Sequence, residues 1–253
     1  FTFVAGAATP PSTTPTPSTT PPPTPSMSAP TPTAPSTSMT ASTPGDAGQS
    51  LAGAPLEAAE TRADTGIDVD AFVDAATCDH AKQAAAKLET FLGNRQLVLG
   101  VDRMDYSKGL IQRFEGMADL FDRHPDVHGQ ISFTQIAPPS RAVVEGYQLL
   151  RQKLDELSGR INGDYGDLDW IPIRYLARGY DRDEIAGLYR LAKVCLVTPL
   201  QDGMNLVAKE FIAAQDPEDP GVLVLSQFAG AAEQMREALI VNPYDAVAIA
   251  EAV

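Results

Sequence analysis

From Gln96 to the C-terminal end, short apolar runs alternate with stretches of helical periodicity. The apolar runs have the length of buried strands, and the stretches between them repeat apolar residues every three to four positions. The expected strands are 97–101, 131–137, 171–176, 194–199, 222–226 and 240–241, and the expected helices are 110–121, 141–157, 182–191 and 204–215. Because the links are short, this alternation predicts an α/β fold, a doubly wound parallel sheet with helices on both faces. In such a sheet, ligands bind at the carboxyl ends of the strands.

The first 64 residues have a different composition. From Ala8 to about Pro44 the chain is almost entirely Pro, Thr, Ser and Ala, without one charged side chain. Such a segment cannot bury enough apolar surface to offset the entropy of ordering, so we expect 1–64 to be a disordered linker or tail. Two alternatives stay open. A glycosylated stalk would need a secretory context, and a wrong-frame translation of GC-rich DNA is suggested by the Phe at position 1.

Order is expected to begin between Thr65 and Asn94. Residues 70–73 and 81–92 have helical spacing, and four apolar side chains of the second stretch can share one face: Ala84, Leu88, Phe91 and Leu92. The predicted organisation is therefore a disordered segment over 1–64, a partial helical lead-in over 65–95 and an α/β domain over 96–253.

Charge and composition exclude several classes of protein. Acidic residues outnumber Lys and Arg by 33 to 19, which gives a net charge of -14. This charge argues against a protein whose main function is to bind nucleic acid or an anionic membrane. No apolar run approaches the roughly 20 residues that span a bilayer. Only two cysteines occur, and Cys195 falls in an expected buried strand. A reducing, cytoplasmic setting is favoured.

Motifs for cofactors and metals are missing from the sequence. No G-x-G-x-x-G follows an expected strand and no G-x-x-x-x-G-K-[ST] occurs, so a dinucleotide cofactor or a P-loop nucleotide site is not predicted. His124 and His128 have the spacing of two metal ligands on a helix, but Pro125 between them favours a loop. We therefore expect neither a metal nor a cofactor.

The most informative polar segment is PLQDGMNLVAKEF, which crosses from an expected strand into an expected helix at 199–211. Free backbone N–H groups and the positive end of the helix dipole point beyond the strand at such a crossing. That suits an anionic or hydroxyl-rich ligand. Glu210, in the first turns of the helix, could accept two neighbouring sugar hydroxyls, although taken alone a solvated helix residue is the simpler interpretation.

Cations follow the first two expected strands. Arg103 and Lys108 lie in one short loop before a helix, where they could neutralise a diphosphate, or they could be surface charges paired with Asp102 and Asp105. After the second strand, Arg141 lies at a helix start behind Ser140, a plausible N-cap. A solvated surface residue is the alternative for Arg141. The segment 159–166 is most simply a turn.

Several long motifs share their order and spacing with one family. RMDYSKGL, SFTQIAPPSR, GRINGDYG, LVTPLQDGMNLVAKEF and GVLVLSQFAGAAEQM, followed by ALIVNPYD, resemble the C-terminal half of the trehalose-6-phosphate synthases, which are retaining glycosyltransferases. The resemblance extends from about Asp68 through Val253 and covers none of the Pro/Thr-rich segment. It implies a Rossmann-like domain, the C-terminal half of a GT-B fold, which binds a nucleotide sugar and is truncated at its C-terminus.

The resemblance also implies roles for residues of this chain. Arg103 and Lys108 would act on the donor diphosphate, Glu210 would bind the ribose, and Arg141 would reach the phosphate of the acceptor, glucose 6-phosphate. Tyr180 and Arg182 would lie beside the donor cleft. The transferred glucose and the phosphates would be surrounded, largely through backbone N–H groups, by Asp202, Gly203, Met204, Asn205, Leu206 and Val207. The donor would be UDP-glucose, with GDP-glucose and ADP-glucose as alternatives.

Two functions from different classes remain. One is glucosyl transfer to glucose 6-phosphate in trehalose biosynthesis, with this chain as the donor half and no protein nucleophile. The other is a non-catalytic nucleotide-sugar-binding fragment or regulatory subunit. Nothing in 1–65 resembles an acceptor domain, so the isolated chain is expected to bind donor without efficient transfer. The oligomeric state stays open, a homo-oligomer included.

Overall fold

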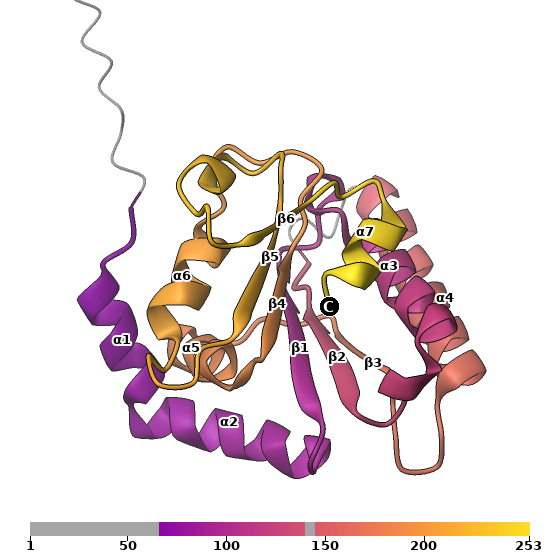
Figure 1. Ribbon diagram of the computed structural model, residues 1–253, viewed down its shortest axis with the longest axis horizontal. Coiled ribbons are helices and arrows are strands. Elements are labelled where there is room, and N and C mark those ends of the chain that lie inside the picture. The colour runs from indigo at the N-terminus through magenta and orange to yellow at the C-terminus, as the bar shows by residue number, and fades with distance from the viewer. Residues whose placement is uncertain (1–65, 140–144) are drawn as a thin grey trace, which may run out of the picture. The chain divides into compact units, whose positions relative to one another are not determined.

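A six-stranded parallel sheet forms the centre of the computed structural model, which describes residues 66–139 and 145–253 (Figure 1). Every neighbouring pair of strands is parallel. The strands are β1 (Gln96–Val101), β2 (Ile131–Ile136), β3 (Ile173–Leu176), β4 (Val194–Val197), β5 (Val222–Ser226) and β6 (Leu239–Val241). The predicted α/β fold with a parallel sheet is therefore confirmed.

The strand order is β3-β2-β1-β4-β5-β6, which is the order of the Rossmann fold. The chain moves outward from β1 to β3 and then crosses back to place β4 on the other side of β1. Loops that leave β1 and β4 consequently diverge, which opens a crevice beyond the carboxyl ends of these strands. Both polar segments that the sequence singles out, the loop after β1 and the crossing after β4, lie at this place.

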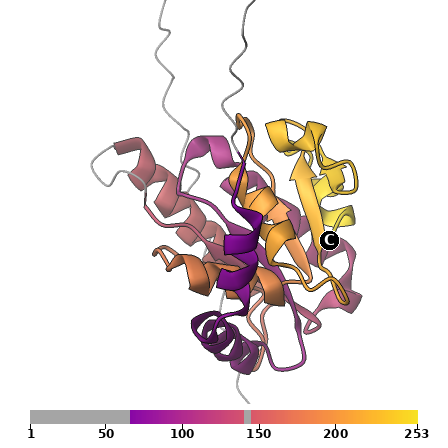
Figure 2. The ribbon, with the colours of Figure 1, turned by 90° about the vertical axis from the view of Figure 1, so that its left-hand side faces the viewer.

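Helices cover both faces of the sheet. Figure 1 shows α1, α2, α5 and α6 on one side and α3, α4 and α7 on the other, and Figure 2 looks onto the layer that contains α1 and α2. Their bounds are α1 (Val69–Thr77), α2 (Asp79–Leu92), α3 (Leu110–Arg123), α4 (Glu145–Tyr165), α5 (Arg182–Leu191), α6 (Leu206–Ala214) and α7 (Ala246–Glu251), with short 3-10 turns η1 (Tyr106–Lys108), η2 (Pro125–Val127) and η3 (Gly230–Glu233). Two apolar cores result, one on each face.

Successive side chains along a strand pack alternately into the two cores. Leu97 and Leu99 of β1 pack into the core beneath α1, α2, α5 and α6, whereas Val98 between them packs into the other. Because successive side chains of a strand point to opposite faces, a continuous apolar run suits a strand that is covered on both sides. Cys195 of β4 is completely buried, as predicted.

One secondary-structure prediction was wrong. Residues 159–166 were expected to form a turn, but α4 continues through Gly159 and Gly163 to Tyr165. Burial of Leu154, Leu157 and Ile161 on one helix face outweighs the weak helix propensity of two glycines. The Asn162 side chain also holds this end of the helix to β3, since it both accepts from the backbone N–H of Ile173 and donates to its carbonyl, each at 2.8 Å.

The remaining predicted elements lie close to their predicted bounds, and α7 follows β6. Pro125 begins η2 directly after α3, so His124 and His128 do not share a helix face. In the described ranges, no helix is long and apolar enough to cross a membrane. The disorder expected for 1–64 and the placement of Ser140 and Arg141 fall outside the described residues.

Candidate functional site

A cavity of about 410 Å³ opens at the carboxyl ends of β1 and β2, beside the point where the strand order reverses. Five predicted site residues line it: Arg103, Tyr180, Arg182, Val207 and Glu210. The other lining residues are Phe72, Val101, Asp102, Ile136, Pro138, Gly179, Ile185 and Tyr189. Segments that are far apart in the sequence thus meet around one space that combines an apolar wall with charged groups of both signs.

Arg103 supplies an available positive charge to this cavity. Parallel pairing continues past the ends of β1 and β2, because the N–H of Met104 donates to the carbonyl of Pro138 at 2.9 Å. Met104 is buried, and its neighbour Arg103 is exposed. Among the described residues, Arg103 has no carboxylate partner. The alternative that Arg103 is neutralised by a neighbouring aspartate is therefore wrong.

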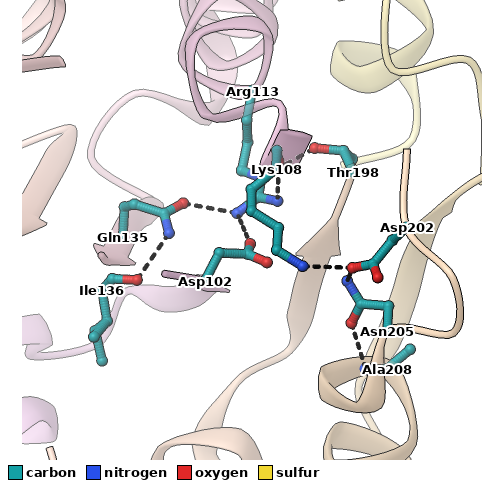
Figure 3. A network of polar contacts seen from close by, with 9 residues as sticks. All are labelled: Asp102, Lys108, Arg113, Gln135, Ile136, Thr198, Asp202, Asn205 and Ala208. Atoms are coloured by element: carbon teal, nitrogen blue, oxygen red, sulfur yellow. Dashed lines mark hydrogen bonds and ion pairs between the residues drawn. The ribbon is translucent and has the colours of Figure 1, made fainter. Parts of the chain in front are cut away.

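Lys108 lies at the end of η1 in the same connection. Asp105 caps η1 by accepting from the N–H of Ser107 at 3.0 Å, and this backbone bond is the main reason that the pKa of Asp105 is lowered. The ammonium of Lys108 contacts Asp202 Oδ2 at 2.5 Å, across the gap between the β1 and β4 loops (Figure 3). The predicted alternative partners, Asp102 and Asp105, are engaged elsewhere.

Asn205 connects Asp202 to the start of α6. Its side-chain oxygen caps α6 by accepting from the N–H of Ala208 at 3.4 Å, while its amide nitrogen donates to Asp202 Oδ2 at 3.1 Å. Its φ is 67°, the only positive value for a residue other than glycine in the described part of the chain. Left-handed backbone costs such a residue about 1 kcal/mol, and local strain of this kind often accompanies ligand sites.

A layer of buried polar side chains lies directly beneath the loop. Arg113 of α3 is completely buried and donates to Asp102 (2.8 Å), Gln135 (2.9 Å) and Thr198 (3.0 Å). We call these four residues the Arg113 network (Figure 3). Burial raises the pKa of Asp102, and the charge of Arg113 opposes that rise. The network joins the ends of β1, β2 and β4 under the site.

Sequence reasoning missed the Arg113 network, although one signal was present. Leu110, Arg113, Phe114 and Met117 recur at helical spacing, and all four are buried. An arginine within an apolar stripe of a helix requires buried partners, because an unpaired buried charge is very costly. Phe72 was missed for another reason: α1 belongs to the lead-in segment, which was not expected to line a site.

Glu210 of α6 also lines the cavity. Its carboxylate is half-buried, which raises its pKa, while the hydroxyl of Tyr189, 3.5 Å away, and the charge of Arg182 act in the other direction. Burial likewise raises the pKa of Tyr189 well above its ordinary value, so the phenol is a donor. Glu210 thus offers acceptor oxygens to the cavity beside apolar Val207 and Ile185.

The other predicted residues within the described ranges do not line this cavity. Lys108, Asp202 and Asn205 form their own polar cluster, and Gly203, Met204 and Leu206 lie in the same crossing from β4 to α6. Gly203 is exposed, whereas Met204 packs against the core. Arg141 is outside the described residues.

The sequence model of glycosyltransferase family 20 matches residues 61–253. The chain belongs to this family. A trehalose-6-phosphate synthase of Sinorhizobium fredii is 49% identical over 180 residues, which are 71% of this chain and 39% of that protein. The chain therefore spans about two fifths of the length of this curated family 20 relative.

Solved structures of family 20 members agree with this assignment. A UDP-forming α,α-trehalose-phosphate synthase from Burkholderia xenovorans in complex with glucose-6-phosphate is 48% identical, with a TM-score of 0.72 over 74% of this chain and 41% of that one. An Escherichia coli structure bound with UDP-2-fluoro glucose is 50% identical, with a TM-score of 0.71 and the same coverage. The similarity extends over most of this chain.

Proposed function

We propose that this chain is the donor-binding part of a retaining glycosyltransferase that transfers glucose from UDP-glucose to glucose 6-phosphate and forms trehalose 6-phosphate. Residues 96–253 would be the nucleotide-sugar-binding domain, and the lead-in over 65–95 would contribute Phe72 to its wall. The relatives' complexes with UDP-2-fluoro glucose and glucose-6-phosphate support this choice of substrates. Two cysteines that form no disulfide accord with a cytoplasmic protein.

The observation that carries the proposal is that a cation with no acidic partner among the described residues lines the same cavity as a half-buried carboxylate. A nucleotide sugar needs both: Arg103 for the diphosphate and Glu210 for the ribose hydroxyls. Tyr180 with Ile136 and Pro138 would provide an apolar surface for the base, and Arg182 would flank the ribose. Gly203, Met204, Leu206 and Val207 would surround the sugar and phosphates through their backbone.

The chemistry requires the nucleoside diphosphate to leave the anomeric carbon of glucose. Negative charge then grows on the leaving phosphate, where Arg103, Lys108 and the start of α6 would stabilise it. The acceptor hydroxyl would attack from the face that the leaving group vacates, so no protein nucleophile takes part. Arg141 would hold the acceptor's phosphate, and the isolated chain would transfer poorly because orientation of both sugars is a large part of catalysis.

Titration calorimetry with UDP-glucose tests the donor site. Arg103→Ala and Lys108→Ala should each weaken binding about 10- to 100-fold, the loss expected for one charge-assisted hydrogen bond. Arg151→Ala and Lys153→Ala are matched controls, since both residues are exposed on α4 in ion pairs within the helix. Unchanged affinity in both site variants would disprove the assignment.

An assay for trehalose 6-phosphate separates the proposal from its alternative, a nucleotide-sugar-binding fragment or regulatory subunit. Donor binding with no product, even when UDP-glucose and glucose 6-phosphate are saturating, would favour the alternative for the chain on its own. Trehalose 6-phosphate formed by the chain alone, or after an acceptor-binding half is added, would favour the proposal that the chain is part of an enzyme. Light scattering in the same samples would determine whether the chain forms a homo-oligomer.

A further inference from the structure

The two cations of the β1–α3 connection differ in one respect that bears on specificity. Lys108 is ion-paired to Asp202, and both side chains are mostly buried, with 16% and 19% of their surface exposed. Arg103 has no acidic partner among the described residues and is exposed to the cavity. A ligand phosphate can therefore approach Arg103 directly, whereas at Lys108 it must compete with a carboxylate.

We propose that Asp202 is an internal counter-ion of Lys108 that makes tight binding of the diphosphate depend on the glucose attached to it. The proposal rests on the proposed function, in which Lys108 stabilises the diphosphate, and on the family resemblance, which places Asp202 beside the transferred glucose. Asp202 is here a specificity-determining residue: it acts against nucleoside diphosphates that carry no sugar.

The geometry around Asp202 supports this role. One oxygen, Oδ2, receives both the Lys108 ammonium at 2.5 Å and the Asn205 amide at 3.1 Å. No hydrogen bond to the other oxygen occurs within the described residues. The carboxylate thus has acceptor capacity left for hydroxyl donors of a sugar. Asn205, which caps α6, keeps Asp202 in this place.

The electrostatic consequence differs for the two ligands. A diphosphate alone brings negative charge next to Asp202 and must draw Lys108 away from it, and both effects weaken binding. A diphosphate that carries glucose also presents hydroxyl groups. These can donate to Asp202 and replace the hydrogen bond from Lys108 that Asp202 loses. Lys108 then becomes available to the phosphates. After transfer the glucose is gone, Asp202 regains Lys108, and release of the nucleoside diphosphate is favoured.

Titrations of UDP and UDP-glucose against the same variants test this inference. Asp202→Asn removes the charge but keeps the shape, so it should bind UDP about 3- to 10-fold more tightly than the unmodified chain. Its affinity for UDP-glucose should fall about 10-fold. Arg103→Ala should weaken the binding of both ligands by the same factor, because no carboxylate in the described ranges couples that cation to the sugar.

Asp216→Asn is a matched control, because Asp216 forms a similar ion pair with Arg190 at 2.6 Å, away from the cavity. It should leave both affinities unchanged. Thermal unfolding of each variant checks that the fold is intact, and Asp202→Ser is a second variant if Asp202→Asn does not fold.

The outcomes separate this inference from the proposed function. UDP binding that is unchanged or weaker in a folded Asp202 variant would overturn the counter-ion role, while losses in Arg103→Ala and Lys108→Ala would leave the donor site standing. If neither of those two cation variants changes the affinity for UDP or UDP-glucose, the proposed function itself fails. Tighter UDP binding in Asp202→Asn supports the inference.

Discussion

Two arginines near the carboxyl end of β1 have opposite surroundings. Arg113 is completely buried, and its guanidinium donates to Asp102, Gln135 and Thr198 within the chain. Arg103 is exposed and lines the cavity without an acidic partner in the described ranges. A buried cation whose partners are all internal contributes to the fold, whereas a cation without them can bind an external anion. The comparison separates a structural layer from a proposed ligand-binding layer, although Asp102 of the first and Arg103 of the second are adjacent in the sequence.

Breaking the structural layer should have the largest effect. Arg113→Met leaves the buried Asp102 carboxylate without its counter-ion and should lower the free energy of unfolding by about 3–5 kcal/mol. Arg103→Met, the matched change at the exposed position, should alter it by less than about 0.5 kcal/mol. Urea unfolding followed by circular dichroism measures both values.

A double variant sharpens this result. Arg113→Met with Asp102→Leu removes both charges, so it should recover part of the stability that Arg113→Met loses. If the single Arg113 variant were as stable as the Arg103 variant, the distinction between the two layers would be wrong.

The next effect concerns Gly109, where the loop after β1 approaches Thr198, directly after β4. Gly109 has a φ of 65°, and a Cβ there would lie 2.2 Å from the carbonyl oxygen of Thr198. Gly129 has a similar φ of 72° but open space around it. Gly129→Ala should lower the free energy of unfolding by about 1–2 kcal/mol, because alanine must adopt a left-handed backbone there. Gly109→Ala should cost at least about 1 kcal/mol more in the same unfolding assay, because the loop must also move away from β4. Equal costs would show that the close approach to Thr198 does not matter.

The fold was largely predictable from the sequence, for identifiable reasons. Strands such as β5 (Val222–Ser226) and helices such as α5 (Arg182–Leu191) formed at the predicted residues, since their apolar periodicity agrees with their burial. The end of α4 was not predictable from local signals. Gly159 and Gly163 favour a turn locally, and the Asn162 contacts with β3 exist only in the folded sheet.

The places of candidate residues were easier to predict than their pairings. Arg103 and Glu210 were singled out by their positions near the ends of expected strands, and Tyr180 and Arg182 by the family resemblance. All four line one cavity. The Lys108–Asp202 ion pair joins positions that are distant in the sequence, so nearby Asp102 and Asp105 were the natural candidates instead. Spatial proximity across β1 and β4 depends on the strand order, which local patterns do not encode.

Two buried threonines allow a smaller test of the same distinction. Thr198 and Thr134 are both completely buried, but within the described part of the chain only the Thr198 hydroxyl has a hydrogen-bond partner, the Arg113 side chain at 3.0 Å. Thr198→Val should cost about 1–2 kcal/mol, because it removes an acceptor from a buried cation. Thr134→Val should instead stabilise the chain by up to about 1 kcal/mol, since the Thr134 hydroxyl makes no hydrogen bond with the described residues. Effects of the same sign and size would contradict the idea that internal pairing decides the role of these polar groups.

The smallest expected change comes from Glu210, which belongs to the proposed ligand-binding layer. Burial raises its pKa, so the folded chain holds the proton more tightly than the unfolded chain, whose carboxyl has a pKa of about 4.3. The contribution of this proton to the free energy of unfolding is fully present at pH values below the pKa of Glu210 in the unfolded chain. It is lost as the pH rises through the pKa of Glu210 in the folded chain. At pH 7 the charged Glu210 consequently costs stability.

Glu210→Gln should therefore raise the Tm at pH 7 by about 1–2 °C, a value reduced by solvent screening of a half-exposed group. The gain should shrink as the pH falls below about 4, because Glu210 then becomes protonated in both states. The same variant should bind UDP-glucose more weakly, because an amide is a poorer acceptor for ribose hydroxyls than a carboxylate. Glu237→Gln, at an exposed position, is the control and should change neither quantity. A carboxylate that binds a ligand and is only partly neutralised within the protein should weaken the fold. A lower Tm of Glu210→Gln at pH 7, with unchanged affinity for UDP-glucose, would contradict this expectation and make Glu210 a stabilising residue like Arg113.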